Sequence, residues 1–222
     1  MAGAWKTPSS TNVIETEIKL RWGGDAATAG SHIEAHGYAA TGPRLLEADQ
    51  LFDRPSKDVK GGDVRGGDLP GGELRASGQV LRLRLSGGEA TVTYKGPVVA
   101  NGPYKSREEI EFIVDDPAAF ELVLSRLGYR RGFRYEKFRT KFRAADEAQV
   151  GEAGQGIVTL DETPMGVFIE LEGAEYWINA TAERLGFTRD QFISASYATL
   201  YNEFRVSQHC LPTDMVFAKS RE

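Results

Sequence analysis

The sequence has little of what disulfide frameworks and thiolate metal centres require. Its 222 residues contain one cysteine, Cys210. A single cysteine excludes an intramolecular disulfide framework and a zinc site built from several cysteines. Sparse cysteine is typical of a reducing compartment, so we expect a cytoplasmic protein.

Long apolar runs and an excess of positive charge are also missing. No run of 18 apolar residues occurs, and residues 1–12 lack the apolar core of a signal peptide, so we expect no membrane association. The formal net charge of −5 argues against broad attraction to nucleic acid or to an anionic membrane surface. Any anionic ligand must therefore meet a local cluster of lysines and arginines.

What the sequence does have is strict alternation in several short segments. In VIETEIKLRW, residues 13–22, every second residue from 15 to 21 is charged, and the residues between them are mostly aliphatic. Side chains alternate between the two faces of a strand, so these charges share one face. Similar alternation predicts further strands at 79–86, 89–96, 104–114, 135–143, 156–162 and 166–173.

Other segments carry the apolar spacing and the end signals of helices. Asp116 before Pro117 is typical of a helix start, and Gly128 is typical of the end of that helix. Thr188 and Gln191 have the spacing of a capping box, which predicts another helix start. The predicted helices run over 26–36, 116–127, 176–185 and 188–201.

A glycine-rich stretch interrupts these patterns. Residues 60–74 read KGGDVRGGDLPGGEL, and glycine at this density costs too much backbone entropy for a rigid element. A phosphate-binding role for these glycines is disfavoured, because acids adjoin them and the strand-to-helix context with a lysine is absent. We expect a flexible N-terminus over 1–12, a single domain over 13–204, a loop insertion over 54–78 and a C-terminal tail over 205–222.

The charged strand faces admit two interpretations. They carry seven basic and seven acidic residues: Lys19, Arg82, Arg84, Lys95, Arg107, Lys137 and Arg139, and Glu15, Glu17, Glu109, Glu111, Asp161, Glu170 and Glu172. Facing solvent, they would need no explanation beyond solubility. In a closed barrel of about eight strands they would line a tunnel large enough for one ligand. The predicted helices need an aliphatic sheet surface to cover, which favours an α+β barrel with helices outside.

Seven short motifs occur in the order of a known family. They are ETEIK (15–19), LRLR (81–84), TYKGP (93–97), REEIE (107–111), KFR (137–139), LDETP (160–164) and FIELEG (168–173). The stretch from Val13 to Phe204 resembles the CYTH superfamily, also called triphosphate tunnel metalloenzymes, which includes class IV adenylyl cyclases, thiamine triphosphatases and inorganic triphosphatases. The resemblance implies a catalytic domain with a closed, antiparallel, eight-stranded β-barrel around a triphosphate tunnel. The glycine-rich insertion and the tail have no counterpart in the family.

The charged residues have the chemistry for a triphosphate and a metal. Guanidinium and ammonium groups bind phosphate oxygens. The expected triphosphate-binding residues are Lys19, Arg82, Arg84, Lys95, Arg107, Lys137 and Arg139, of which Lys19, Arg82 and Arg84 are also the expected catalytic residues. Hard divalent cations need oxygen ligands, which Glu15 and Glu17 offer from one strand face. The resemblance implies that Glu170 and Glu172 bind the same Mg²⁺ or Mn²⁺ from the far side of the tunnel, helped by Asp161 and Glu111.

Three functions remain open from the sequence. The favoured one is metal-dependent hydrolysis of inorganic triphosphate, thiamine triphosphate or a nucleoside triphosphate. The alternative is a class IV adenylyl cyclase, which converts ATP to cyclic AMP and pyrophosphate. A non-catalytic polyphosphate- or nucleotide-binding module is disfavoured, because an anion-binding site gains nothing from several carboxylates unless they hold a metal. The expected partner is a small-molecule triphosphate; the family also allows a homodimer, for which the sequence specifies no interface.

Overall fold

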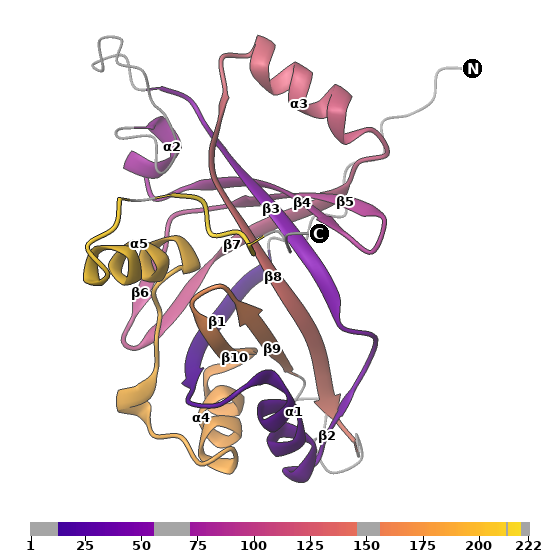
Figure 1. The fold of residues 1–222 in the computed structure, drawn as a ribbon, viewed down its shortest axis with the longest axis vertical. Coiled ribbons are helices and arrows are strands. Elements are labelled where there is room, and N and C mark those ends of the chain that lie inside the picture. Colours follow the sequence, from indigo (N-terminus) through magenta and orange to yellow (C-terminus); the bar gives the residue numbers. More distant parts are fainter. Residues whose placement is uncertain (1–12, 56–71, 146–155, 212, 219–222) are drawn as a thin grey trace.

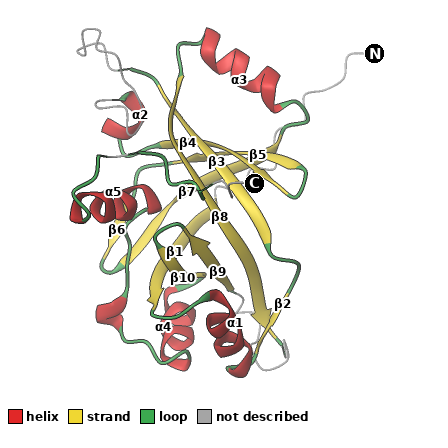
Figure 2. Ribbon diagram, in the orientation of Figure 1, coloured by secondary structure: helices red, strands yellow, loops and turns green. Residues whose placement is uncertain are grey.

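The computed structural model describes residues 13–55, 72–145, 156–211 and 213–218. The strands are β1 (Val13–Trp22), β2 (Tyr38–Ala40), β3 (Leu45–Asp53), β4 (Val80–Ser86), β5 (Glu89–Lys95), β6 (Val99–Asn101), β7 (Tyr104–Ile113), β8 (Arg130–Ala144), β9 (Ile157–Thr163) and β10 (Gly166–Glu172). The helices are α1 (Ala26–Ala35), α2 (Glu73–Ala76), α3 (Pro117–Arg126), α4 (Glu175–Arg184) and α5 (Tyr197–Ser207), with a short 3₁₀ helix at Arg189–Gln191. Figure 1 and Figure 2 show the helices on the outside of one strongly curved sheet.

Eight of the described strands close into an antiparallel barrel. Their order is β1-β10-β9-β8-β3-β4-β5-β7, and β7 pairs back with β1. The short strands β2 and β6 extend the sheet beside β8 and β7. The predicted α+β fold, a closed eight-stranded antiparallel barrel with helices outside, is confirmed. Strand β3 was not among the predicted strands, although it pairs with both β4 and β8.

The aliphatic faces of β1, β9 and β10 point outward and are covered by α1 and α4. Ile18 and Leu20 of β1 are fully buried in a cluster with Ile33 of α1 and Ile178 of α4. A second cluster forms around Phe168 of β10, under α5. Burying this surface provides the main stabilisation of the barrel.

Three of the predicted helices are confirmed, and the fourth is corrected. Asp116 accepts a hydrogen bond from the Ala119 N–H, which caps α3 as its sequence predicts. The capping box at Thr188 is present, but it starts only the 3₁₀ helix. The prediction of one helix over 188–201 is therefore wrong. Helix α5 starts at its own cap, Ser196, because residues 192–195 are not helical and Ile193 pairs with Lys19 of β1.

The chain beyond Phe204 continues the fold. Helix α5 runs to Ser207, past the predicted start of the tail at residue 205. Met215 is fully buried, exchanges backbone hydrogen bonds with β8 and packs in the cluster under α5. Of the predicted insertion over 54–78, residues 56–71 lie outside the described residues, as does the predicted N-terminus over 1–12; Glu73–Ala76 form α2. No described helix has the length and apolarity that a bilayer crossing needs.

Candidate active site

A cavity of about 710 Å³ occupies the inside of the barrel. All eight barrel strands contribute side chains to its lining, and the segment that leads into α5 contributes more. Among the thirteen predicted site residues, twelve line the cavity: Glu15, Glu17, Lys19, Arg82, Arg84, Lys95, Arg107, Glu111, Lys137, Arg139, Glu170 and Glu172. The charged strand faces therefore point into the barrel, and the interpretation that they face solvent is wrong.

Lys19 lies between two carboxylates on neighbouring strands. Its Nζ is 3.0 Å from Glu17 Oε1 and 3.1 Å from Glu170 Oε2. Burial alone would lower the pKa of Lys19, but these two carboxylates outweigh it and raise the pKa above its ordinary value. Burial likewise works against ionisation of Glu170, yet Lys19 and Arg139 hold its pKa at about 2. The pair is ionised at neutral pH.

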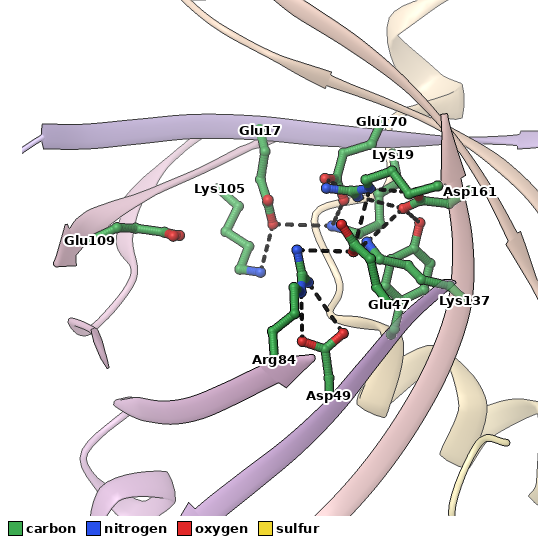
Figure 3. Close-up of polar contacts among 12 residues, drawn as sticks. Glu17, Lys19, Glu47, Asp49, Arg84, Lys105, Glu109, Lys137, Asp161 and Glu170 are labelled. Carbon is green, nitrogen blue, oxygen red and sulfur yellow. Dashed lines mark hydrogen bonds and ion pairs between the residues drawn. The ribbon is translucent and has the colours of Figure 1, made fainter. Parts of the chain in front are cut away.

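Lys105, which was not predicted as a site residue, donates a hydrogen bond to the same Glu17 oxygen as Lys19. Its Nζ lies 2.8 Å from Glu17 Oε1 (Figure 3). Burial is the largest influence and lowers the pKa of Lys105 to about 8, although Glu17 opposes the shift. An ammonium group with this pKa can lose its proton near neutral pH.

Asp161 is the one predicted site residue that does not line the cavity. It is fully buried beneath the lining, where it accepts hydrogen bonds from Lys137 Nζ at 2.9 Å and from Nε and Nη2 of Arg139. The Tyr197 hydroxyl at the start of α5 donates a further hydrogen bond at 2.7 Å. Burial opposes ionisation, but Arg139 and Lys137 hold the pKa of Asp161 far below its usual range. The carboxylate is thus saturated by protein donors.

Two more carboxylates that were not predicted, Glu47 and Asp49 of β3, lie behind the arginines of β4. Arg84 donates to Asp49 through Nε at 2.8 Å and through Nη2 at 3.2 Å, and its Nη1 lies 2.9 Å from Glu47 Oε2 (Figure 3). Arg82 Nε lies 3.4 Å from Asp49 Oδ1, and its Nη2 donates to Thr93 Oγ1 at 2.9 Å. Both arginines therefore meet an acid on the side away from the cavity.

Acidic groups crowd together elsewhere in the cavity. Burial, together with repulsion from Glu172 and Glu109, raises the pKa of Glu15 to about 8. Burial and repulsion from Glu170 and Glu17 raise the pKa of Glu172 as well. These carboxyl groups share too few basic partners, which is the electrostatic condition that a bound cation relieves.

The donor chemistry of this acidic group fits a hard divalent cation. Its ligands are all carboxylate oxygens, which Mg²⁺ and Mn²⁺ prefer. Within the described ranges, no three or more His, Cys, Asp or Glu side chains are already arranged around a metal position. Binding a metal would therefore require these side chains to turn toward it. Glu15 and Glu172 are the best candidates, because Glu17 and Glu170 are already paired with basic side chains.

Several residues of the site were not predicted from the sequence, and the sequence patterns that could have indicated them differ in strength. Lys105 precedes Arg107 by two positions on the same strand, and Tyr135 precedes Lys137 in the same way, so alternation places both in the lining. Glu47 and Asp49 show the two-residue spacing of the ETEIK motif. Tyr197 has no such signal, because its place depends on how α5 packs against the barrel.

One part of the cavity differs from the charged remainder. Along β8 the lining changes from Arg139 and Lys137 to Tyr135 and Phe133, and nearby it includes Leu51 of β3. Ala195, just before α5, and Ala198, in its first turn, add to this apolar lining. A ligand that fills the cavity therefore meets charge in one part and apolar or aromatic surface in the other.

The model of the CYTH domain matches residues 68–183 of this chain, more than half of its length. This chain belongs to the CYTH domain family. The motifs that carry the resemblance, from LRLR to FIELEG, fall within the matched range. The CYTH barrel described above is accordingly the structural setting for every residue assigned to the site.

One protein similar in sequence to this CYTH protein, and two similar in structure, carry names that mention a cyclase. It is 28% identical over 137 residues to a Methanocaldococcus jannaschii protein named "Putative adenylate cyclase MJ0240", covering 57% of this chain and 73% of that protein. A solved Vibrio parahaemolyticus structure described as a "putative adenylate cyclase" has a TM-score of 0.64 at 18% identity, covering 85% of this chain and 98% of that chain. A Hippeastrum structure, described as a "putative adenylyl cyclase" with a dominant triphosphatase activity, has a TM-score of 0.53 at 13% identity, covering 89% of this chain and 96% of that chain. At these identities the two structures show a shared fold.

Proposed function

We propose that this chain is a divalent-metal-dependent enzyme that hydrolyses a triphosphate held inside the barrel, with an organic group attached to that triphosphate. The observation that carries the proposal is the set of buried basic side chains that face one cavity from β1, β4, β7 and β8. A phosphate chain with several negative charges gives these groups a common ligand. Membership of the CYTH family supports the same chemistry.

Lys19, Arg84 and Arg139 would bind the phosphate oxygens. Arginine forks suit the geometry of phosphate, and each charge-assisted hydrogen bond is stronger inside a water-poor cavity than in bulk water. These groups are positioned before the substrate arrives, so little reorganisation is needed when charge develops in the transition state.

A divalent cation, Mg²⁺ or Mn²⁺, would be held by Glu15 and Glu172, with Glu109 nearby. When bound, it would neutralise phosphoryl charge and polarise the phosphoryl oxygens. Glu17 and Glu170 would hold Lys19 in place. Glu111 accepts a hydrogen bond from Thr93, at 2.9 Å, and remains a predicted ligand.

Lys105 is the side chain best suited to accept a proton. Its Nζ has a pKa of about 8, which burial lowers toward the working pH, so a neutral amine is accessible. In a hydrolase it would take the proton from the attacking water. Catalysis by Lys19, Arg82 and Arg84 would then consist of charge stabilisation rather than proton transfer.

The apolar part of the cavity supports an organic triphosphate over inorganic triphosphate. Leu51, Phe133 and Tyr135 offer a surface that a bare phosphate chain would leave unused. The same surface, with the name of the M. jannaschii relative, favours a second candidate function, the cyclisation of ATP to cyclic AMP. In that reaction Lys105 would take the proton from the ribose hydroxyl.

Product analysis distinguishes these functions. Purified protein is incubated with ATP, thiamine triphosphate or inorganic triphosphate and with Mg²⁺ or Mn²⁺, and the products are identified by ³¹P NMR and chromatography. Orthophosphate together with a diphosphate supports hydrolysis, whereas cyclic AMP with pyrophosphate supports the cyclase. Binding without any turnover, in the parent protein and with every metal, would contradict both and favour a binding module.

A further inference from the structure

Three carboxylates form a layer behind the basic residues of the cavity. Glu47, Asp49 and Asp161 are only 5%, 1% and 0% exposed, and none of them is part of the cavity lining. Each contacts at least two basic side chains that do line the cavity. The site thus has basic groups toward the ligand and acids on the protein side.

The contact between Asp49 and Arg84 is the most directional in this layer. Asp49 takes two N–H groups of the guanidinium, from Nε and Nη2, in a bidentate arrangement. A guanidinium has five N–H groups, so three remain for other partners, including a ligand in the cavity. Glu47 adds an ion pair at Nη1 without hydrogen-bond geometry, and its Oε2 has no hydrogen-bond partner. Asp49 therefore determines how the plane of the guanidinium is turned.

Asp49 also contacts the neighbouring arginine. Arg82 Nε lies 3.4 Å from Asp49 Oδ1 without forming a hydrogen bond, so the charge of Asp49 serves both arginines. Two guanidinium groups this close repel each other, and an acid between them on the protein side offsets that repulsion. Without Asp49, Arg84 loses both of its hydrogen bonds to this acid, whereas Arg82 keeps its hydrogen bond to Thr93 Oγ1.

We propose that Asp49 is a positioning residue, which fixes the guanidinium of Arg84 in the orientation that receives the phosphate chain. The inference rests on the proposed function. For the affinity of the Asp49→Asn variant, this role predicts the opposite of simple charge attraction. Replacing Asp49 with asparagine makes the cavity more positive, so simple attraction would tighten binding of an anion. Loss of the arginine orientation would weaken it.

The test is titration calorimetry of inorganic triphosphate in metal-free buffer containing EDTA, which measures binding without turnover. We expect Asp49→Asn to weaken binding about tenfold, and Asp49→Asn combined with Arg84→Ala to bind no worse than Arg84→Ala alone, because both changes act through one side chain. The matched control is Glu162→Gln. Glu162 makes the same bidentate contact with Arg44 on the outside of the barrel, so its loss should change the affinity less than twofold.

The possible outcomes separate the inference from the proposed function. Equal or tighter binding by Asp49→Asn, or losses that add up in the double variant, would overturn the positioning role while triphosphate binding by the parent protein stands. Failure of the parent protein to bind triphosphate, with EDTA and again with Mg²⁺ in its place, would overturn the proposed function and the inference with it. If Asp49→Asn does not fold, Asp49→Glu replaces it in the same cycle, because the longer side chain keeps the charge but displaces the bidentate contact with Arg84. Weaker triphosphate binding by Asp49→Glu that is no longer seen in the Arg84→Ala background would then support the positioning role, and unchanged binding would overturn it.

Discussion

Replacing Lys19 with alanine removes a fully enclosed cation from the centre of the site. In the parent protein its Nζ contacts Glu17 and Glu170 and lies 5.3 Å from the centre of the Tyr197 ring. Glu17 keeps Lys105 as a partner, and Glu170 keeps Arg139. The variant therefore leaves neither carboxylate without a basic partner.

The expected magnitudes follow from these contacts. Removing one partner of a buried ion pair costs about 3–5 kcal/mol when the other charge is left uncompensated. Because each acid keeps a second cation here, we expect Lys19→Ala to lower the free energy of unfolding by less than about 3 kcal/mol. Loss of a charge-assisted hydrogen bond to phosphate costs about 1.5–3 kcal/mol. This corresponds to a roughly tenfold to hundredfold loss of triphosphate affinity.

The assay is titration calorimetry with inorganic triphosphate, run beside urea unfolding to show that the variant is folded. Arg143→Ala is the control, because Arg143 is exposed at the outer end of β8 and should lose almost no affinity. If Lys19→Ala binds triphosphate as well as Arg143→Ala does, the phosphate chain does not reach Lys19. The assignment of the charged β1 face to substrate binding would then be refuted.

Three further predictions concern the metal, the pH and the C-terminal segment. EDTA should abolish turnover, and Glu15→Gln should raise the metal concentration needed for half-maximal activity at least tenfold; full activity in metal-free buffer would contradict this. The pKa of Glu15 is raised from 4.5 to about 8 by burial and neighbouring acids, so its ionisation costs stability as the pH rises through this window. A bound cation reverses that cost, so Mg²⁺ should raise the melting temperature more at pH 8.5 than at pH 6, and an equal or opposite shift would contradict the acidic site. Met215→Ala should lower the free energy of unfolding by about 2–5 kcal/mol in urea titrations, and no change would mean that the segment does not dock.

Alternation along single strands predicted the barrel and most of its lining. The ETEIK and LRLR segments show which side chains share a face, because the period of two is a local property of the chain. Whether that face points inward depends on closure of the sheet. The sequence indicated closure only through its predicted helices, because their apolar stripes need the aliphatic face of the sheet as a packing partner.

What the sequence did not predict depends on contacts between distant segments. Strand β3 places Glu47 and Asp49 on one face by the same alternation. No strand was predicted there from the sequence, only the glycine-rich loop that follows it. Asp161 belongs to a recognised motif, yet its burial beneath Lys137 follows from the packing of β8 against β9. Tyr197 reaches Asp161 only because α5 begins eight residues after the position that the capping box at 188 suggested.

The central claim is that a triphosphate lies inside the barrel, between its basic and acidic side chains. A crystal structure with inorganic triphosphate and Mn²⁺ tests it most directly, because the anomalous signal locates the metal. The account predicts phosphate oxygens within hydrogen-bond distance of Lys19 and Arg84, and Mn²⁺ bound by Glu15 and Glu172. Triphosphate bound on the outer surface, with Lys19 and Arg84 still contacting only protein carboxylates, would contradict it.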